Sequence, residues 1–493
     1  MEISCPIDEQ YASEISALLK PPPPPHLVQE YYDQLLESRQ CHSIRVKQEG
    51  EFGKGVYANA DFKEGELLLR DEMLFGCQHS SNKIDCLVCS FCFCFIGSIE
   101  LQIGRRLYFQ DVGVHPHHGC GAETFSGISN NHQGSDSSNG EDIPYGESYD
   151  NMETCGPSSK AEIIPLPKEI VQSLMNGELK LPCSEKFYLP SVVPCSGGCK
   201  EAYYCSKQCA EADWSSFHSL LCTGERSEAS SREVLVQFIK HANETNDIFL
   251  LAAKAISFTI LRYRKLKAAR LSQRASLNIS NSCDLSLLME AWRPISVGHK
   301  KRWWECVALP EDVASSDEAA FRMQIKDLAF TSLQLLRAAI FDRECALLFS
   351  LEIYGHIIGM FELNNLDLVV ASPVEDYFLY IDDRPSSEKE EAEKVTRPIL
   401  DALRDEYAVI CEGSAFFPLQ SCMNHSCRPN AKAFKRDEDR DGRATIIAQI
   451  PIRCGDEVTI SYIDEDLTFE ERQAALADYG FICRCSKCQE EET

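Results

Sequence analysis

The chain has 493 residues, a hydrophobic content of 44% and a formal net charge of −27. This length predicts about three domains, and the composition suffices for a sizeable core. The negative charge excludes nucleic acid as a partner of the whole surface and favours basic peptides, although the charge taken alone is better explained as an aid to solubility.

Residues 1–43 combine helix-like sequence with the proline tract Pro21–Pro25. We interpret this tract as an extended polyproline spacer rather than as a docking motif for an aromatic-lined domain. In the next segment, residues 44–85, the stretches Gly53–Tyr57 and Glu66–Leu69 predict the two strands of a β-hairpin.

Two cysteine clusters follow within residues 86–222, at Cys86–Cys94 and at Cys195–Cys222. Between them, residues 122–163 are rich in Ser, Gly, Asn, Asp and Glu and contain few apolar residues. Such a segment buries too little apolar surface to offset the entropy lost on ordering. The composition therefore predicts a disordered acidic insertion.

Residues 230–350 have a mostly helical pattern, and their basic runs Arg262–Lys267 and Lys300–Arg302 allow two interpretations. Each run is either a nuclear-import signal or a solvated helix face, and the second interpretation is favoured. The clearest apolar residues at helical spacing are Ile248, Leu251, Ala252, Ala255 and Ile256.

Strands return in residues 411–465, where Ala431–Lys435 and Arg443–Gln449 flank a polar turn and predict a hairpin. Glu457–Ile463 predicts a further strand, and residues 466–493 predict a short helix followed by cysteines. Two capping boxes mark helix starts, Ser387 with Glu390 and Thr468 with Glu471.

Cysteine usage points to metal sites in an intracellular protein. There are 25 cysteines, and the N-terminal sequence lacks the basic and apolar regions of a signal peptide. No apolar run reaches the ~18 residues needed to cross a membrane, since Lys254 interrupts the longest one, Ile248–Leu261. Clustered cysteines in such a chain predict metal binding rather than disulfides.

The spacing of these cysteines fits about three zinc ions. One cluster supplies Cys195, Cys199, Cys205, Cys209, His218 and Cys222, and a second supplies Cys427 with Cys483, Cys485 and Cys488. Two tetrahedral sites need eight ligands, so the six of the first cluster require a further pair. Both Cys86 with Cys89 and Cys89 with Cys92 have suitable spacing, and the choice stays open.

These motifs resemble two known families. Tyr204-Cys205-Ser206, Cys209, Trp214, His218 and Cys222 resemble a MYND zinc finger. Asn424-His425-Ser426-Cys427, Ile460-Ser461-Tyr462 and the final cysteines resemble a SET domain with its post-SET zinc. Together they are similar to the SMYD group of protein lysine methyltransferases, and most similar to the SMYD-like, trithorax-related SET proteins of plants.

The resemblance implies an α+β fold made of small sheets. The SET domain would comprise residues 44–85 and 411–465, interrupted by the MYND finger in 86–222 and by a helical insert in 223–410. The post-SET zinc site in 466–493 would close it.

The resemblance also implies a role for each matched residue. S-adenosylmethionine would be held by the Gly-x-Gly turn and the Asn-His pair, and Tyr462 and Tyr479 would line the lysine channel beside the methyl group. Asn364, which resembles a further cofactor asparagine, is equally compatible with a polar loop residue. The implied cofactor-binding residues are Gly53, Lys54, Gly55, Asn364, Asn424, His425, Tyr462 and Phe481.

The chemistry of the residues agrees with this assignment. Methyl transfer from a sulfonium to an amine is an in-line displacement, so alignment supplies much of the catalysis. The lysine amine must be neutral, although the free side chain has a pKa of about 10.4. An aromatic channel desolvates the ammonium and lowers its pKa. Tyr462 by itself would be an ordinary strand tyrosine; its place between the two cysteine motifs favours the catalytic role.

We therefore predict a nuclear protein-lysine methyltransferase that acts as a monomer on histone tails, with histone H3 favoured. Other basic, lysine-containing peptides are the first alternative. The second is a zinc-stabilised adaptor whose MYND finger recruits Pro-rich or transcription-factor partners. Neither direct sequence-specific nucleic-acid binding nor membrane association is expected.

Overall fold

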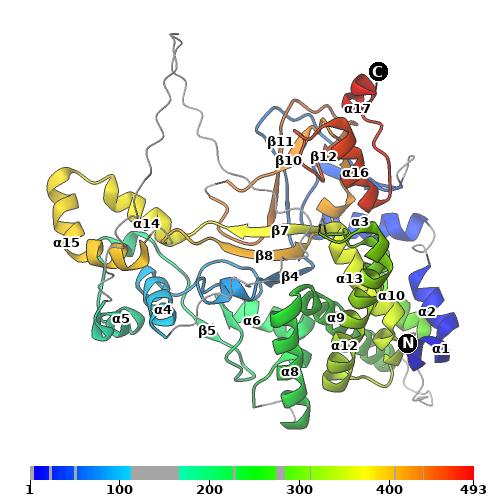
Figure 1. Ribbon diagram of the computed structural model, residues 1–493, viewed down its shortest axis with the longest axis horizontal. Helices are drawn as coiled ribbons and strands as arrows, with labels where there is room; N and C mark the ends of the chain where they lie inside the picture. Colours follow the sequence, from blue (N-terminus) through cyan, green and yellow to red (C-terminus); the bar gives the residue numbers. More distant parts are fainter. Residues whose placement is uncertain are drawn as a thin grey trace.

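The computed structural model shows an α+β protein with several small sheets, which confirms the predicted fold class (Figure 1). The predicted disordered insertion 122–163 and most of the proline tract lie outside the described residues. The described residues are 5–20, 25–48, 53–112, 166–225, 229–273, 284–310, 312–404, 407–436 and 438–492.

One four-stranded sheet joins segments from both ends of the chain. Its order is β1 (Ile44–Lys47), β2 (Gly55–Ala58), β12 (Glu457–Ile460) and β9 (Asn424–His425). Strand β2 pairs antiparallel with β1 and with β12, whereas β12 pairs parallel with β9. The sheet therefore brings the Gly-x-Gly turn that precedes β2 next to Asn424.

The hairpin predicted from Gly53–Tyr57 and Glu66–Leu69 is wrong. Strand β3 (Leu67–Asp71) lies in a different sheet, where it pairs with β11 (Ala444–Ala448). The hairpin of β10 (Ala431–Ala433) with β11 is confirmed. A third sheet has the order β4 (Phe75–Gln78), β8 (Cys411–Phe416), β7 (Asn365–Val370).

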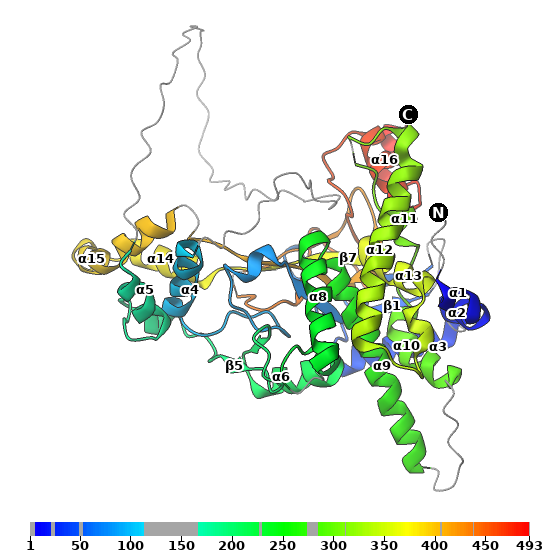
Figure 2. The ribbon, with the colours of Figure 1, turned by 60° about the horizontal axis from the view of Figure 1, so that its bottom comes forward.

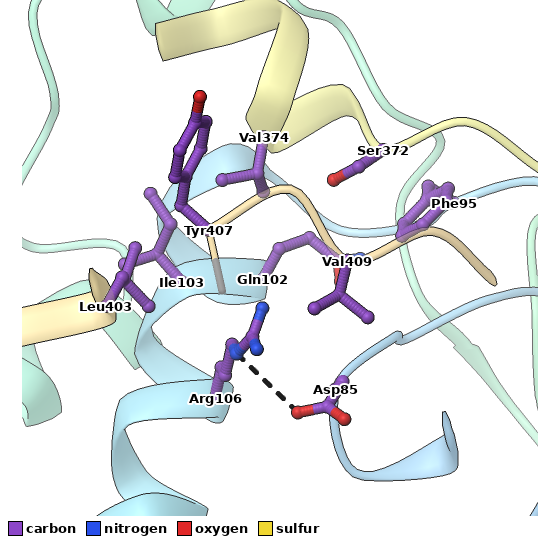
Figure 3. Close-up of a pocket in the computed structure, with 10 residues that line it drawn as sticks. All are labelled: Asp85, Phe95, Gln102, Ile103, Arg106, Ser372, Val374, Leu403, Tyr407 and Val409. Carbon is purple, nitrogen blue, oxygen red and sulfur yellow. Dashed lines mark ion pairs between the residues drawn. The ribbon is translucent and has the colours of Figure 1, made fainter. Parts of the chain in front are cut away.

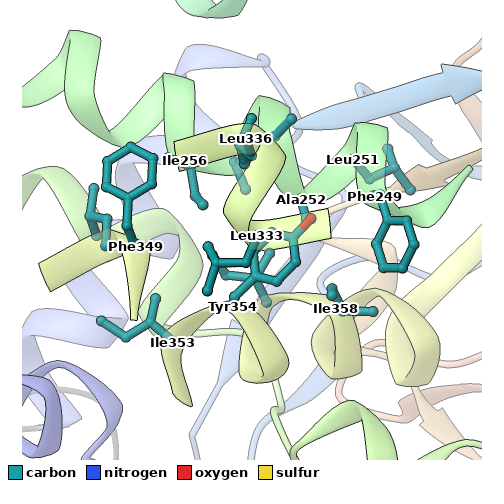
Figure 4. Packing of buried hydrophobic residues seen from close by; sticks show 14 of the residues in the cluster. Phe249, Leu251, Ala252, Ile256, Leu333, Leu336, Phe349, Ile353, Tyr354 and Ile358 are labelled. Atoms are coloured by element: carbon teal, nitrogen blue, oxygen red, sulfur yellow. The ribbon is translucent and has the colours of Figure 1, made fainter. Parts of the chain in front are cut away.

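The predicted helical segment is confirmed, and its helices pack around the main apolar core. They are α8 (Ala229–Thr245), α9 (Ile248–Gln273), α10 (Leu285–Ser296), α11 (Trp303–Cys306), α12 (Glu318–Ile340) and α13 (Leu351–Asn364). Figure 4 shows the centre of this core, where side chains of α9, α12 and α13 point towards one another. The apolar residues that predicted α9 are buried there.

The N-terminal helices belong to the folded unit. Helices α1 (Pro6–Gln10) and α2 (Ala12–Leu19) pack against the main core, in which Ile7 and Ile15 are buried. Helix α3 (Pro25–Ser38) packs its buried Tyr32 against the core of the four-stranded sheet.

A separate lobe is formed by α4 (Ile99–Asp111), α5 (Lys168–Met175), α14 (Pro373–Asp382) and α15 (Ser386–Leu403), which share a small core (Figures 1 and 2). The capping box predicted at Ser387 is wrong, because α15 begins at Ser386 after Pro385 and has no side-chain cap. The finger next to this lobe contains β5 (Val193–Pro194), β6 (Tyr203–Tyr204) and α6 (Lys207–Asp213).

The chain ends in α16 (Phe469–Tyr479) and α17 (Ser486–Glu491). The capping box at the start of α16 is confirmed, since Thr468 and Glu471 exchange both hydrogen bonds. Helix α16 stops at Gly480, whose φ of 88° lies in the left-handed region that favours glycine. Within the described parts of the chain, no helix is both long and apolar enough to cross a membrane.

Candidate active site and metal centres

The structure gathers the predicted zinc ligands into three groups. Within each group, all ligand atoms lie within 4.8 Å of one another. The groups are Cys89, Cys92, Cys205 and Cys209; Cys195, Cys199, His218 and Cys222; and Cys427, Cys483, Cys485 and Cys488.

The distances inside these groups fit zinc. Zinc–sulfur bonds of about 2.3 Å in a tetrahedron place the sulfur atoms about 3.8 Å apart. The Sγ atoms of Cys195 and Cys222 are 3.8 Å apart, and those of Cys427 and Cys488 are 3.6 Å apart. Such distances exclude disulfide bonds, whose sulfur atoms are about 2 Å apart. We expect each group to hold one zinc ion, without which four thiols, or three thiols and an imidazole, would be crowded together.

Cys86 is not brought to either finger site, so its inclusion among the predicted ligands is corrected. Its thiol instead lies 3.2 Å from the carbonyl oxygen of Ile410 and is buried. The residues that follow Cys86 contact strand β6 of the finger, where Ser90 N donates to Tyr203 O over 2.8 Å. This contact places Cys89 and Cys92 beside Cys205.

The Asn-His pair lies where β9 and β12 run side by side. Asn424 donates through Nδ2 to Lys54 O at 3.1 Å and to Glu457 Oε1 at 2.7 Å. It thereby connects the Gly-x-Gly turn to the edge of the sheet. A Cβ atom on Gly55 would come within 2.7 Å of Glu457 Oε1 and 3.2 Å of Asn424 Nδ2, so a larger residue would displace the Glu457 side chain and disturb its bond with Asn424.

His425 connects the predicted catalytic tyrosine to the C-terminal metal group. Tyr462 N donates to His425 Nδ1 over 3.0 Å, and His425 Nε2 lies 3.2 Å from Cys427 Sγ. Because Nδ1 accepts, the proton of the neutral ring is on Nε2 and points at the sulfur. Burial, with the charge of Arg472, lowers the pKa of His425 to about 4.

Tyr462 and Phe481 pack against this histidine, and Tyr479 packs on Tyr462. The rings of Tyr462 and Tyr479 are 5.2 Å apart, and Phe481 lies 6.0 Å from the ring of His425. The Tyr462 hydroxyl donates to Met423 O, and the Tyr479 hydroxyl donates to Tyr462 O over 3.4 Å. Burial is the main cause that raises the pKa of Tyr479 to about 12, and it also raises that of Tyr462.

The segment between α10 and α11 lies beside the predicted cofactor residues. Lys54 Nζ donates to Val297 O over 2.8 Å. Asn364 donates through Nδ2 to His299 O at 2.9 Å and to Met360 O at 2.7 Å, so its amide nitrogen holds this segment to α13. This bonding gives Asn364 a structural role, and its contact with the cofactor stays a prediction.

The basic run Lys300–Arg302 is tied into the structure. Lys300 Nζ donates to the carbonyl oxygens of Ile295, Ser296 and Gly298 over 2.7–2.8 Å, which closes the C-terminal end of α10. Burial and the charge of Lys54 lower the pKa of Lys300 to about 7. Arg302 pairs with Glu352. The run lies between α10 and α11 and not on a helix, so the favoured interpretation of a solvated helix face is wrong here.

Two carboxyl groups near Tyr479 were not anticipated from the sequence. Glu362 accepts a hydrogen bond from Trp303 Nε1 over 3.1 Å. Burial, together with the charge of Asp478, raises the pKa of Glu362 to about 7. Both carboxyl groups also act on the phenol of Tyr479. No sequence motif predicts that Glu362 and Asp478 are close, because their helices, α13 and α16, are far apart in the sequence.

We expect Glu362→Gln to stabilise the protein at pH 8 but not at pH 5. The raised pKa favours the neutral acid in the fold, so its contribution to stability is present below about pH 4.5 and is lost as the pH rises through 7. The gain at pH 8 should be about 3 kcal/mol, since the pKa of Glu362 is raised from 4.5 to about 7. Urea unfolding at both pH values measures it, and equal effects at the two pH values would contradict the assignment.

A small cavity elsewhere in the fold is separate from this site (Figure 3). It is lined by Arg106, whose Nε lies 3.6 Å from Asp85 Oδ1, and by apolar side chains of α4 and α14 such as Ile103 and Val374. None of the predicted catalytic or cofactor residues lines it.

Comparison with known proteins gives the family. The SET domain profile matches residues 287–463, and the MYND finger profile matches residues 183–222. Histone-lysine N-methyltransferase ATXR2 of Arabidopsis thaliana is 63% identical to this chain over 486 residues, which are 99% of the chain and 98% of that protein. The chain belongs to the SET and MYND family of lysine methyltransferases.

More distant relatives of this SET and MYND protein match over shorter stretches. Protein-lysine N-trimethyltransferase SMYD5 of Gallus gallus is 22% identical over 58% of this chain and 63% of that protein. Histone-lysine N-methyltransferase SET5 of Meyerozyma guilliermondii is 38% identical over 16% of each chain. The predicted family resemblance is confirmed.

Proposed function

We propose that this SET and MYND enzyme transfers the methyl group of S-adenosylmethionine to lysine side chains of histone tails, with histone H3 as the favoured substrate. The observation that carries the proposal is the cluster of Tyr462, Tyr479 and Phe481 on His425, next to the turn held by Asn424. The full-length similarity to a histone-lysine N-methyltransferase supports the substrate class.

Binding of the cofactor is assigned to the turn Gly53–Gly55 and to Asn424 and His425. S-adenosylmethionine supplies a methyl group on a positively charged sulfur. The open space at Gly53 allows a ligand to approach the backbone of this turn, whereas the space beside Gly55 is filled by Glu457 and Asn424. Phe481, on the segment that follows α16, would cover the bound cofactor.

The two tyrosines orient and desolvate the substrate amine. Their raised pKa values keep both phenols un-ionised at neutral pH, so neither is a phenolate base. Their part is to present aromatic faces that attract the ammonium and to fix the direction of the neutral amine by hydrogen bonding. Proton loss to water precedes the transfer, since the partly buried channel lowers the pKa of the substrate amine.

Charge favours a basic substrate. Asp464, Glu465 and Asp466 begin two residues after Tyr462, and the chain carries a net charge of −27. Such groups raise the local concentration of a basic tail at the channel. Action on a histone substrate would take place in the nucleus, and recruitment of Pro-rich partners by the MYND finger belongs to the adaptor alternative.

We expect the intact, zinc-loaded protein to transfer labelled methyl groups to histone octamers and to histone H3 tail peptides. The matched control is the same peptide with every lysine replaced by arginine, which keeps the charge and removes the acceptor amine. Transfer only to non-histone basic peptides would replace the substrate assignment. No transfer to any peptide, with cofactor binding intact, would favour the adaptor alternative.

A further inference from the structure

Arg472 is a fully buried arginine beside the C-terminal metal group. It lies on α16 and is 1% exposed. One of its terminal nitrogens lies 4.0 Å from Cys488 Sγ and pairs with Glu491, and the other donates to Leu467 O over 2.6 Å. The guanidinium also contacts the thiol of Cys427. One side chain thus joins α16, α17 and two of the four candidate zinc ligands.

The composition of this metal group explains why a cation lies there. Zinc bound by four thiolates carries a formal charge of about −2, and a charge that is removed from water is costly unless it is paired. Three of the four cysteines are buried, namely Cys427, Cys483 and Cys488. Hydrogen-bond donors from Arg472, and from Gln473 Nε2 at 3.4 Å from Cys488 Sγ, compensate this charge.

The two finger sites do not require a buried cation to compensate the charge of their thiolates. The group of Cys89, Cys92, Cys205 and Cys209 also has four thiols, but three of them are partly exposed, so water can solvate the charge. The other finger group is buried to the same degree as the C-terminal one but contains His218 in place of one thiolate. Among the described groups, the C-terminal one alone combines four thiols with deep burial.

The same helix carries the aromatic residues of the active site. Helix α16 begins just before Arg472 and ends at Tyr479, whose ring packs on Tyr462. Phe481 follows after the turn at Gly480 and precedes the ligand Cys483. Loss of the Arg472 charge should therefore disturb the metal group and, through it, the positions of Tyr479 and Phe481.

We infer that Arg472 is a positioning residue, whose charge holds the thiolate-rich C-terminal zinc site together and thereby fixes Tyr479 and Phe481. The role is electrostatic, so a lysine at this position should largely replace the arginine, whereas a neutral side chain of similar length should not. If the role of Arg472 were packing, methionine would replace it better than lysine, because methionine fills the buried space without introducing a charge of different geometry.

The test compares Arg472→Met with Arg472→Lys in the full chain. Zinc content and the rate of zinc transfer to a chromogenic chelator are measured together with the KM for S-adenosylmethionine. We expect Arg472→Met to release one zinc at least about tenfold faster and to raise KM, and Arg472→Lys to stay within about threefold of the wild type.

The matched control is Arg106→Met, which removes another buried arginine, paired with Asp85 far from this group (Figure 3). It should leave zinc release unchanged. Wild-type zinc release from Arg472→Met would overturn the inference, as would equally fast release from Arg472→Lys. If Arg472→Met does not fold, the lysine variant decides by itself, since zinc loss from a chain that keeps the charge contradicts an electrostatic role. Zinc release is measured without substrate, so its outcome is separate from that of the methylation assay.

Discussion

Replacing Tyr462 with phenylalanine is expected to lower the rate of methyl transfer by at least about 100-fold while the protein stays folded. The substitution removes only the hydroxyl, which donates to Met423 O, and leaves the ring packed against His425 and Tyr479. Loss of one such hydrogen bond should reduce the free energy of unfolding by about 1 kcal/mol. Single-turnover rates with a histone H3 peptide measure the effect on chemistry.

A matched control separates the hydroxyl from a general effect of the substitution. Tyr188→Phe makes the same chemical change at a side chain that is 85% exposed and belongs to none of the site groups. It should leave the rate unchanged. A Tyr462→Phe enzyme that transfers methyl groups within threefold of the wild-type rate would remove Tyr462 from the catalytic residues.

The second large effect is expected from Cys485→Ser, which should abolish activity and reduce the zinc content from about three to about two ions per chain. Serine is a poor zinc ligand, and the remaining three thiols cannot complete the tetrahedron. The segment from Phe481 onward would then lose its anchor on Cys427, and the cover of the cofactor site would be released. Elemental analysis and limited proteolysis of the C-terminus measure the two consequences.

Cys454→Ser is the control for this variant. Cys454 is an exposed free thiol that belongs to none of the metal groups among the described residues. It should retain about three zinc ions and full activity. A Cys485→Ser protein with wild-type activity would show that the metal group does not hold the active site.

Local sequence features were sufficient to predict most of the residues that the structure gathers into candidate metal groups. Cysteines a few residues apart can reach one ion whatever the rest of the chain does, which is why both the finger and the C-terminal ligands could be predicted. The choice between Cys86 and Cys92 required a contact across the fold, the bond from Ser90 to Tyr203.

The features that could not be predicted from the sequence depend on contacts between segments that are far apart in the chain. Strand β2 has the local signals of a hairpin strand, but its second partner is β12, which lies near the other end of the chain. The acidic pair at Glu362 and the buried Arg472 likewise depend on which helices meet. The spacing of Ser387 and Glu390 fits a capping box, but the structure starts α15 at Ser386, after Pro385, without a side-chain cap.

Equilibrium binding of S-adenosylmethionine to the intact, zinc-loaded chain, measured by calorimetry, tests the proposed methyl transfer most directly. The site described here predicts one bound cofactor per chain, with binding lost in Cys485→Ser and kept in Tyr462→Phe. A zinc-loaded wild-type protein that binds no S-adenosylmethionine would contradict both the assigned cofactor site and the proposed methyl transfer.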